Sequence, residues 1–425
     1  MTAPLSADRG RVRNLGRALR HRNYRLFFGG QGTSLAGTWI TRIATSWLVY
    51  RLTGSALLLG VVGFAGQIPT LVLAPFAGVL VDRWDKHRIL VITQVLSMLQ
   101  SLALAVLAIP HLITVTDIVA LQLFQGVINA FDTPARQSFL VQMIEDRTDL
   151  PNAIALNSTM VNASRIIGPS IAGVLIALVG EGWCFMLDAV SYIAVIWSLQ
   201  AMRLARVTRV PTDTSLLEEM REGFAYVSRF RPARALLLLI ALVATMGMPY
   251  TILMPAIAKL VLHGGPHTFG LLMAASGVGA LCGALYLASR HSIIGLWRVI
   301  AMAAAAFGVG LIGFSLSRTL VLSFLILPVV GAGMMVSLAS CNTILQTMVE
   351  ERLRGRVMAF YAMSFLGTAP IGSLIGGVVA DRIGAPKTIL LGGIACVVGA
   401  SVFALALPRL RPHIRTVYAE RGVAR

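Results

Sequence analysis

The feature that most constrains this chain is a succession of about twelve apolar stretches, each long enough to cross a lipid bilayer as a helix. They fall at about residues 24–50, 55–81, 89–109, 115–136, 152–179, 183–201, 235–260, 268–289, 297–315, 320–345, 356–380 and 388–407. Backbone polar groups inside a bilayer must be hydrogen-bonded within the protein, and long continuous apolar stretches satisfy this as helices. The sequence therefore predicts an all-α membrane protein with twelve transmembrane helices.

The composition agrees with a membrane protein and argues against one that binds nucleic acid. Hydrophobic residues make up 56% of the chain and charged residues only 13%, so most of it must lie in apolar surroundings. The net charge of +18 comes from cations in short gaps between apolar stretches, without the aromatic or polar side chains that read nucleic acid. The cysteines, Cys184, Cys282, Cys341 and Cys396, show no metal-ligand spacing. We expect no cofactor, no metal and no nucleic-acid partner.

The charges in the gaps predict the orientation of the helices. Alternate gaps are rich in arginine and lysine, among them the gap with Arg83, Lys86 and Arg88 and the central charged stretch, whereas the gaps between them hold few cations. Cytoplasmic loops carry the excess of arginine and lysine, so both termini are expected in the cytoplasm. The predicted parts are a basic tail (1–23), a six-helix half (24–202), a cytoplasmic central loop (203–234), a second six-helix half (235–407) and a second basic tail (408–425).

An internal repeat relates the two halves. The sequence QMIEDR at 142–147 recurs as TMVEER at 347–352, and each is followed by a predicted helix that contains a proline, Pro169 or Pro370. The glycine-rich ends of these helices also match, with Gly173, Val174 and Gly180 corresponding to Gly377, Val378 and Gly384. Such a repeat predicts two six-helix halves arranged in parallel.

Three groups of motifs resemble one superfamily of transporters. The gap after the second stretch resembles the loop motif G-x-x-x-D-R-x-x-x-x-R/K of the major facilitator superfamily, at Gly78, Asp82, Arg83 and Arg88. The sequences DTPARQSFL, LPNAIALNS and IIGPSIAGV, which begin at 132, 150 and 166, are similar in order and spacing to the superfamily's bacterial drug and siderophore exporters, the transmembrane secretion effectors. Gly168, Pro169 and Gly173 resemble part of the antiporter motif of helix 5.

The resemblance implies a secondary active exporter with the major facilitator fold. Its expected substrates are small amphipathic molecules, drug-like or siderophore-like, moved by alternating access in exchange for protons across the bacterial cytoplasmic membrane by a monomer. It also implies a conformational latch of Gly78, Asp82, Arg83 and Arg88, in which Asp82 contacts the start of helix 11 near Gly355. Arg88 is expected to reach Asp132 and so to connect the latch with the fourth helix.

Polar residues inside the apolar stretches are candidates for contact with substrate, because polar groups in hydrocarbon need partners or water. The fourth stretch carries five on one helical face, and the first stretch carries a similar face on which Arg42 is expected to be buried. The expected substrate cavity comprises Gln31, Thr38, Arg42, Gln122, Gln125, Asn129, Asn162, Asn342 and Gln346. For the amides, hydrogen bonding between helices is an equally good interpretation. Methionines 246, 248, 254, 334 and 335 are expected either in the core or on a soft apolar wall of the cavity.

Coupling to protons requires an ionisable group among the helices. Asp132, near the inner end of the fourth helix, and Asp188, near the outer end of the sixth, are the candidates. An arginine usual in the family's fourth helix is replaced by Gln122, so coupling through that arginine is in doubt. The sequence has no G-x-x-x-x-G-K-S/T motif, which argues against ATP hydrolysis.

Other functions stay open on the sequence alone. A lipid flippase or a nutrient importer of the same fold fits the same pattern, because the fold sets neither substrate nor direction. A membrane assembly protein without transport activity fits less well. A membrane-embedded enzyme is not expected, since the sequence has no H-E-x-x-H motif and no Ser/His pair within the apolar stretches.

The topology can be tested by labelling single cysteines in a variant without the four native ones. Ser215→Cys, in the central loop, should react with a membrane-impermeant maleimide only from the cytoplasmic side, and Gly265→Cys only from the outside. Labelling at 215 from the outside would contradict the twelve-helix topology.

Overall fold

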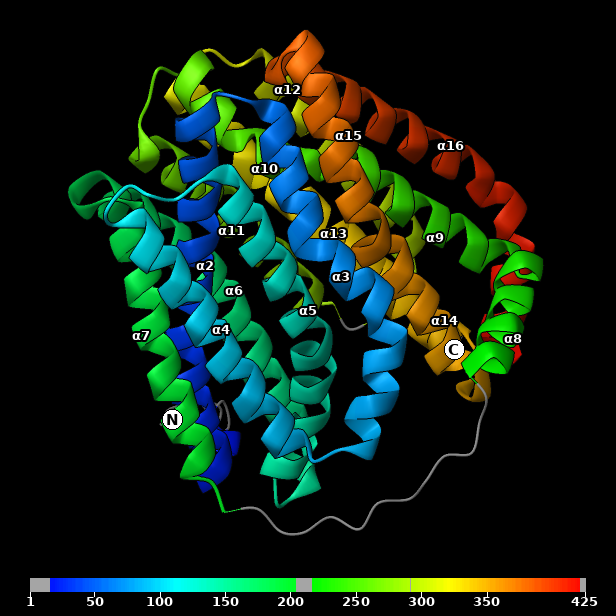
Figure 1. Cartoon of the computed structure of the whole chain (residues 1–425). Helices are drawn as coiled ribbons and strands as arrows, with labels where there is room; N and C mark the ends of the chain where they lie inside the picture. The colour runs from blue at the N-terminus through cyan, green and yellow to red at the C-terminus, as the bar shows by residue number, and fades with distance from the viewer. Residues whose placement is uncertain (1–15, 204–215, 291, 421–425) are drawn as a thin grey trace, which may run out of the picture. The chain divides into compact units, whose positions relative to one another are not determined.

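The described part of the chain is almost entirely helical in the computed structural model (Figure 1). The structure describes residues 16–203, 216–290 and 292–420. The first long helices are α2 (Arg22–Thr53), α3 (Ala56–Arg83), α4 (Lys86–Ala108), α5 (Val115–Leu140), α6 (Leu150–Val179) and α7 (Glu181–Gln200). They are followed by α8 (Leu216–Arg229), α9 (Arg231–Leu242), α10 (Pro249–Ala256), α11 (Pro266–Ala288), α12 (Leu296–Leu316), α13 (Leu320–Met348), α14 (Glu351–Ala362), α15 (Thr368–Ile383) and α16 (Ala385–Glu420).

Short segments connect or interrupt these helices. The 3₁₀ turns are η1 (Arg17–Arg20), η2 (Val141–Met143) and η3 (Arg147–Asp149). The π-helical segment η4 (Val243–Gly247) joins α9 to α10, and η5 (Ile257–Val261) extends α10, so that the four form one continuous rod. A third π-helical segment, η6 (Met363–Gly367), joins α14 to α15.

Within the described residues, 10 helical segments are long and apolar enough to cross a membrane. They are α3, α4, α6, α7, the rod from α9 to η5, α11, α12, α13, the rod from α14 to α15, and α16. Helices α2 and α5 have 32 and 26 residues, long enough to span, but they are more polar and are not among the ten. These two helices carry the polar faces predicted to contact substrate, and the count of twelve spans stays a prediction.

The predicted central loop and C-terminal tail contain more helix than expected. Residues 204–215 lie outside the described part, but 216–229 form α8, and α16 continues past the predicted boundary at 407 to Glu420. Glu222 of α8 forms an ion pair with Arg356 of α14, and the rings of Phe224 and Phe360 lie 6.3 Å apart. The central segment is therefore held against the start of α14.

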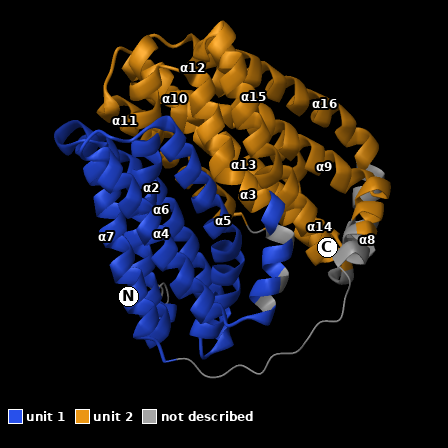
Figure 2. Ribbon diagram, in the orientation of Figure 1, with its two compact units in different colours: residues 1–45, 72–211 blue, residues 46–71, 212–425 orange. Residues whose placement is uncertain are grey.

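Contacts divide the chain into two compact units (Figure 2). The first unit comprises residues 1–45 and 72–211, and the second comprises 46–71 and 212–425. The C-terminal end of α2 and the N-terminal part of α3 thus pack with the second half of the chain. The domain boundaries predicted from the sequence stay a prediction about the membrane-spanning halves.

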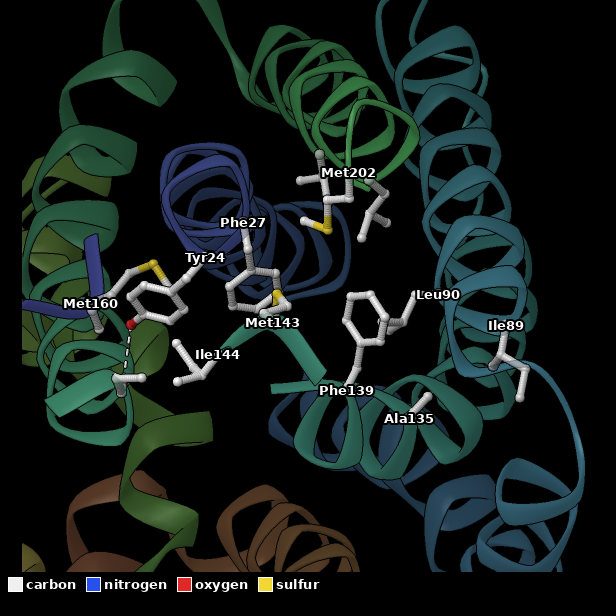
Figure 3. Close-up of a cluster of buried hydrophobic side chains, with 14 of the residues drawn as sticks. Tyr24, Phe27, Ile89, Leu90, Ala135, Phe139, Met143, Ile144, Met160 and Met202 are labelled. Carbon is white, nitrogen blue, oxygen red and sulfur yellow. Dashed lines mark hydrogen bonds between the residues drawn. The ribbon is translucent and has the colours of Figure 1, made fainter. Parts of the chain in front are cut away.

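A cluster of buried apolar side chains fills one end of the first unit (Figure 3). Tyr24 and Phe27 of α2 meet Leu90 of α4, Phe139 of α5 and Met143 of η2 there. The hydroxyl of Tyr24 donates a 2.9 Å hydrogen bond to the backbone carbonyl of Ala153, at the start of α6. The cluster also includes residues of α3, α6 and α7, and therefore joins the six long helices α2 to α7 at the ends that carry the cation-rich gaps.

Glycines permit the closest helix contacts in the second unit. A Cβ atom at Gly331 of α13 would overlap the carbonyl oxygen of Ser276 in α11, and one at Gly279 would overlap the carbonyl of Pro328. A Cβ atom at Gly60 of α3 would lie 2.6 Å from the carbonyl oxygen of Ser373 in α15. Membrane helices associate through such small residues because backbones must approach closely to gain dispersion energy and hydrogen bonds.

The two glycines that end the repeated helices adopt the same backbone conformation. Gly180 follows α6 with φ 85°, and Gly384 follows α15 with φ 88°. An L-residue with a side chain is strained at such positive φ values, whereas glycine is not. The next helix begins at the following residue in both places, so this part of the sequence repeat is also a repeat of local structure.

The contact between α11 and α13 can be tested with Gly331→Ala. The added methyl group would push against the backbone of Ser276, so we expect a loss of about 1–3 kcal/mol in stability and a lower melting temperature in lipid nanodiscs. Gly29→Ala in α2 is the matched control, because a Cβ atom there meets nothing within 4 Å among the described residues. If the Gly331→Ala protein had the same melting temperature as the Gly29→Ala control, α11 and α13 would have room to separate.

Candidate functional site

Helix α4 carries a polar face that is buried in the first unit. Five of its polar side chains, three or four residues apart or adjacent, are at most 4% exposed: Thr93, Gln94, Ser97, Gln100 and Ser101. This spacing places them on one face of the helix. They were not predicted from the sequence, although the same spacing rule that marks the face on α5 identifies them. The face links two buried carboxylates, one on α5 and one on α7.

Asp132 of α5 is a fully partnered carboxylate. It accepts hydrogen bonds of 2.9 Å from the Thr93 hydroxyl and 2.8 Å from the Gln94 amide, and it forms an ion pair with Arg136 one turn later. Only 3% of its side chain is exposed, so the charge depends on these partners. The expectation that Arg88 reaches Asp132 is wrong. Arg88 instead lies 3.9 Å from Asp85, its near neighbour in the chain.

Asp188 of α7 is a buried carboxylate of a different kind. Its Oδ2 atom accepts hydrogen bonds of 2.8 Å from the hydroxyls of Thr41 in α2 and Ser101 in α4. Its Oδ1 atom is buried and has no hydrogen-bond partner among the described residues. This atom lies against Gly37 of α2, where a Cβ atom would be only 2.5 Å away. Three helices therefore enclose a carboxylate that, within the described chain, has hydroxyl donors but no ion pair.

Further hydrogen bonds connect the surroundings of the two carboxylates. The amide of Gln125 donates to the Ser97 hydroxyl at 3.3 Å and to Asn129 at 3.2 Å. The hydroxyls of Thr38 in α2 and Tyr192 in α7 are 3.5 Å apart. For Gln125 and Asn129 these contacts favour hydrogen bonding between and along helices over direct contact with substrate.

The other predicted cavity residues differ in burial and partners. Gln31 is buried, and Gln122 is half-buried. Asn162 is half-buried and bonds the carbonyl of Ser158 in its own helix at 2.8 Å. In the second unit the amide of Gln346 donates to Asn342, one turn earlier on α13. That all of these line one cavity stays a prediction.

Arg42 was expected to be buried, but its side chain is exposed, as is that of Thr38. The guanidinium carbon of Arg42 lies 4.9 Å from the centre of the Trp39 ring, and that of Arg165 in α6 lies 5.9 Å from it. The exposure follows from the helix face: Thr41, next to Arg42, points to Asp188, so Arg42 must point elsewhere.

The methionines of the second unit fall into two groups. Met254 and Met334 are buried in the core, as methionines in helix bundles usually are. Met246 is 38% exposed, and Met248 and Met335 are half-buried. The latter three are the ones available to an apolar ligand.

The motifs of the family resemblance are placed as follows. Gly168 permits a close contact, because a Cβ atom there would overlap the Cβ atom of Trp39 in α2, and Pro169 and Gly173 are buried in α6. In the loop motif the side chain of Asp82 lies outside the described part. Among the described residues, nothing lies within 4 Å of a Cβ atom placed at Gly78 or Gly355. The latch and the antiporter role stay predictions.

Asp85, in the middle of the loop motif, has a local role that was not predicted. Its carboxylate accepts hydrogen bonds from the backbone nitrogens of His87, at 2.9 Å, and Arg88, at 3.3 Å. It is thus the N-cap of α4, the usual position for an aspartate that ends a short turn. The signal was present in the sequence as an acidic residue four positions before a long apolar stretch.

Comparison with known proteins places the chain among transporters. A family model described as transmembrane secretion effector matches residues 17–416. The staphyloferrin A transporter of Staphylococcus aureus is 28% identical over 378 residues, which cover 89% of this chain and 94% of the relative. The multidrug efflux pump Tap of Mycolicibacterium fortuitum is 28% identical over 389 residues, which cover 89% of this chain and 94% of the relative. Macrolide efflux protein A of Streptococcus pyogenes is 26% identical over 393 residues, which cover 88% of this chain and 94% of the relative.

Solved structures agree in fold. A bacterial homologue of the human lysosomal transporter Spinster, in an inward-facing and unoccupied conformation, matches with a TM-score of 0.69 at 16% identity, over 91% of this chain and 97% of that one. A POT family transporter in complex with 5-aminolevulinic acid matches with a TM-score of 0.70 at 10% identity, over 92% and 96%. These likenesses show a transporter fold and carry no information on substrate.

The pairing of Asp132 can be tested by removing one partner or both charges. Asp132→Ala leaves Arg136 and Gln94 without this acceptor, whereas the Thr93 hydroxyl keeps the carbonyl of Leu90. We therefore expect a loss of about 3–5 kcal/mol in the free energy of unfolding and earlier thermal unfolding in detergent. The double variant Asp132→Asn, Arg136→Gln removes both charges and should lose less. If the Asp132→Ala variant unfolded at the same temperature as the wild type, the ion pair would not stabilise the fold.

Proposed function

Since this chain belongs to the transmembrane secretion effector family of the major facilitator superfamily, and is a membrane transporter rather than an enzyme, we propose that it exports small amphipathic molecules in exchange for protons. The site of action is the bacterial cytoplasmic membrane, with both termini in the cytoplasm and a monomer as the working unit. Export is supported by the relatives, two of which are named for efflux. Drug-like or siderophore-like substrates are supported in the same way.

The observation that carries proton coupling is the environment of Asp188. A proton carrier must gain and lose its proton during transport, so its carboxylate cannot be neutralised by a permanent cation. Asp132 has such a cation in Arg136, whereas Asp188 has two hydroxyl donors on one oxygen and a second oxygen with no donor among the described residues. We assign Asp188 as the proton carrier and Asp132 to a structural ion pair.

The hydroxyls around Asp188 suit both protonation states. A hydroxyl can donate to a carboxylate and can also accept from a carboxylic acid, so Thr41 and Ser101 are able to remain partners when the proton arrives. The groups that face Asp188 are Gly37 and Thr41 from α2, Ser101 from α4, and Ser191 and Tyr192 from α7. The Ser191 hydroxyl donates to the backbone carbonyl of Asp188, which leaves the Oδ1 atom available for the proton.

Helix α2 supplies a route from protonation to conformational change. Thr41 is in the part of α2 that belongs to the first unit, while residues from 46 onward belong to the second. Alternating access needs a contact whose strength differs between two states, and a difference of 1.4 kcal/mol shifts such an equilibrium about tenfold. The hydrogen bond from Thr41 to Asp188, stronger when the carboxylate is charged, is such a contact.

Proton coupling is tested in proteoliposomes with an imposed pH gradient and a panel of amphipathic dyes and drugs. Asp188→Asn keeps an acceptor for Thr41 and Ser101 but cannot titrate, so gradient-driven transport should fall at least about tenfold while exchange without a gradient continues. Asp188→Glu should keep part of the driven transport. Glu145→Gln, an exposed carboxylate in the loop between η2 and η3, is the matched control. Full gradient-driven transport by Asp188→Asn would show that the proton is carried elsewhere.

A further inference from the structure

Two arginines share one tryptophan inside the first unit. Arg42 lies one turn after Trp39 on α2, and Arg165 lies near the middle of α6. Their guanidinium carbons are 4.9 Å and 5.9 Å from the centre of the Trp39 ring, within the distance at which a cation is attracted to an aromatic face. Both positive charges therefore lie within 5.9 Å of the centre of one ring.

The arrangement is built by the backbone. Gly168, one turn after Arg165, has no side chain, and this lets α6 approach α2 so closely that a Cβ atom would overlap the Cβ atom of Trp39 and come within 3.2 Å of the Ala36 carbonyl oxygen. Arg165 must therefore emerge beside Trp39. The helix crossing therefore places both arginines beside the same ring.

The charge of Arg165 is not paired with either buried carboxylate of the unit. Asp132 is paired with Arg136, and Asp188 is bound by Thr41 and Ser101. Arg165 forms no ion pair with any acidic residue in the described chain, and it repels the charge of Arg42. Two like charges among membrane-spanning helices are costly, so an anion that binds both would lower their free energy.

The surroundings suit a ligand that is partly apolar. Arg42 is exposed and Arg165 is half-buried, so neither residue is closed off within the unit. A guanidinium group presents a planar fork of N–H donors that matches a carboxylate, and the indole of Trp39 offers an apolar face beside it. Thr38, which directly precedes Trp39 on α2 and is exposed, adds a hydroxyl group.

We propose that Arg42, Arg165 and Trp39 form a binding site for the carboxylate end of an amphipathic anion. The inference rests on the proposed function and narrows its substrate class from amphipathic molecules in general to those that carry a carboxylate next to an apolar body. Cationic amphipathic molecules are repelled by the same two arginines.

The test uses three probes that differ only in their head group: 1-pyrenebutyrate, 1-pyrenebutanol and 1-pyrenebutylammonium. Energy transfer from tryptophan to pyrene measures their binding to the full-length protein in uncharged lipid nanodiscs. We expect the wild type to bind the carboxylate at least about tenfold more tightly than the alcohol, and the ammonium compound most weakly. Equal affinity of the wild type for carboxylate and alcohol, or no binding of the carboxylate, would overturn the proposal.

Variants assign the preference to the site. In the double variant Arg42→Gln, Arg165→Gln, the affinities for the carboxylate and the alcohol probe should become equal. Each single variant should lose part of the difference between these two affinities. Arg165→Lys keeps the charge without the fork and should retain a weaker preference. Arg318→Gln, which removes an exposed arginine in the gap between α12 and α13, is the control for net charge and should behave as the wild type. An undiminished preference in the double variant, or in both single variants if the double variant does not fold, would overturn the site.

The outcome is separable from that for export. Wild-type vesicles that export the alcohol or the ammonium probe under a pH gradient, without any preference for the carboxylate in binding, would leave export standing and overturn the anion site. Carboxylate-selective binding that is lost in the double variant, without driven transport of any probe, would support the site and contradict export.

Discussion

The need of every buried polar side chain for a partner governs the first unit of this protein. Inside a membrane there is no water to replace a missing hydrogen bond, so a carboxylate among apolar helices determines which groups must lie beside it. Asp132 and Asp188 both accept hydrogen bonds from the polar face of α4, and Asp188 also accepts one from α2. The order in which these helices pack follows from these bonds as much as from their apolar faces.

The same requirement separates two kinds of charge. The Asp132 and Arg136 pair is complete within one helix and stabilises the charges of both residues, which suits a structural role. Asp188 has an oxygen without a donor among the described residues, and Arg165 forms no ion pair in that part of the chain. Groups left incomplete in this way are suited to a proton and to an anionic ligand, which is why the proposed chemistry is placed on them.

Small residues set how closely the helices approach, and so they decide which polar groups can meet. Gly37 brings α2 against Asp188, and Gly168 brings α6 against Trp39. In the second unit, Gly279 and Gly331 do the same for α11 and α13. At Gly279 and Gly331 the nearest neighbours are backbone atoms, so even one added methyl group cannot be accommodated there without moving a helix.

The sequence by itself determined the class of the molecule, because apolar stretches of membrane-spanning length must be helices, and the motifs around Asp82 and Gly168 were sufficient for the family. It also identified Asp132, Asp188 and Arg42 as polar residues that need an explanation. The polar face of α4 was equally readable from its spacing but was not recognised. What only the tertiary structure decided is which of these residues are partners: that Asp132 takes Arg136 and not Arg88, that Thr41 turns to Asp188 while Arg42 turns to Trp39, and that Arg165 joins it there. The periodicity of a helix states which residues share a face, but the neighbour of that face depends on the crossing of helices far apart in the chain, which local sequence does not encode.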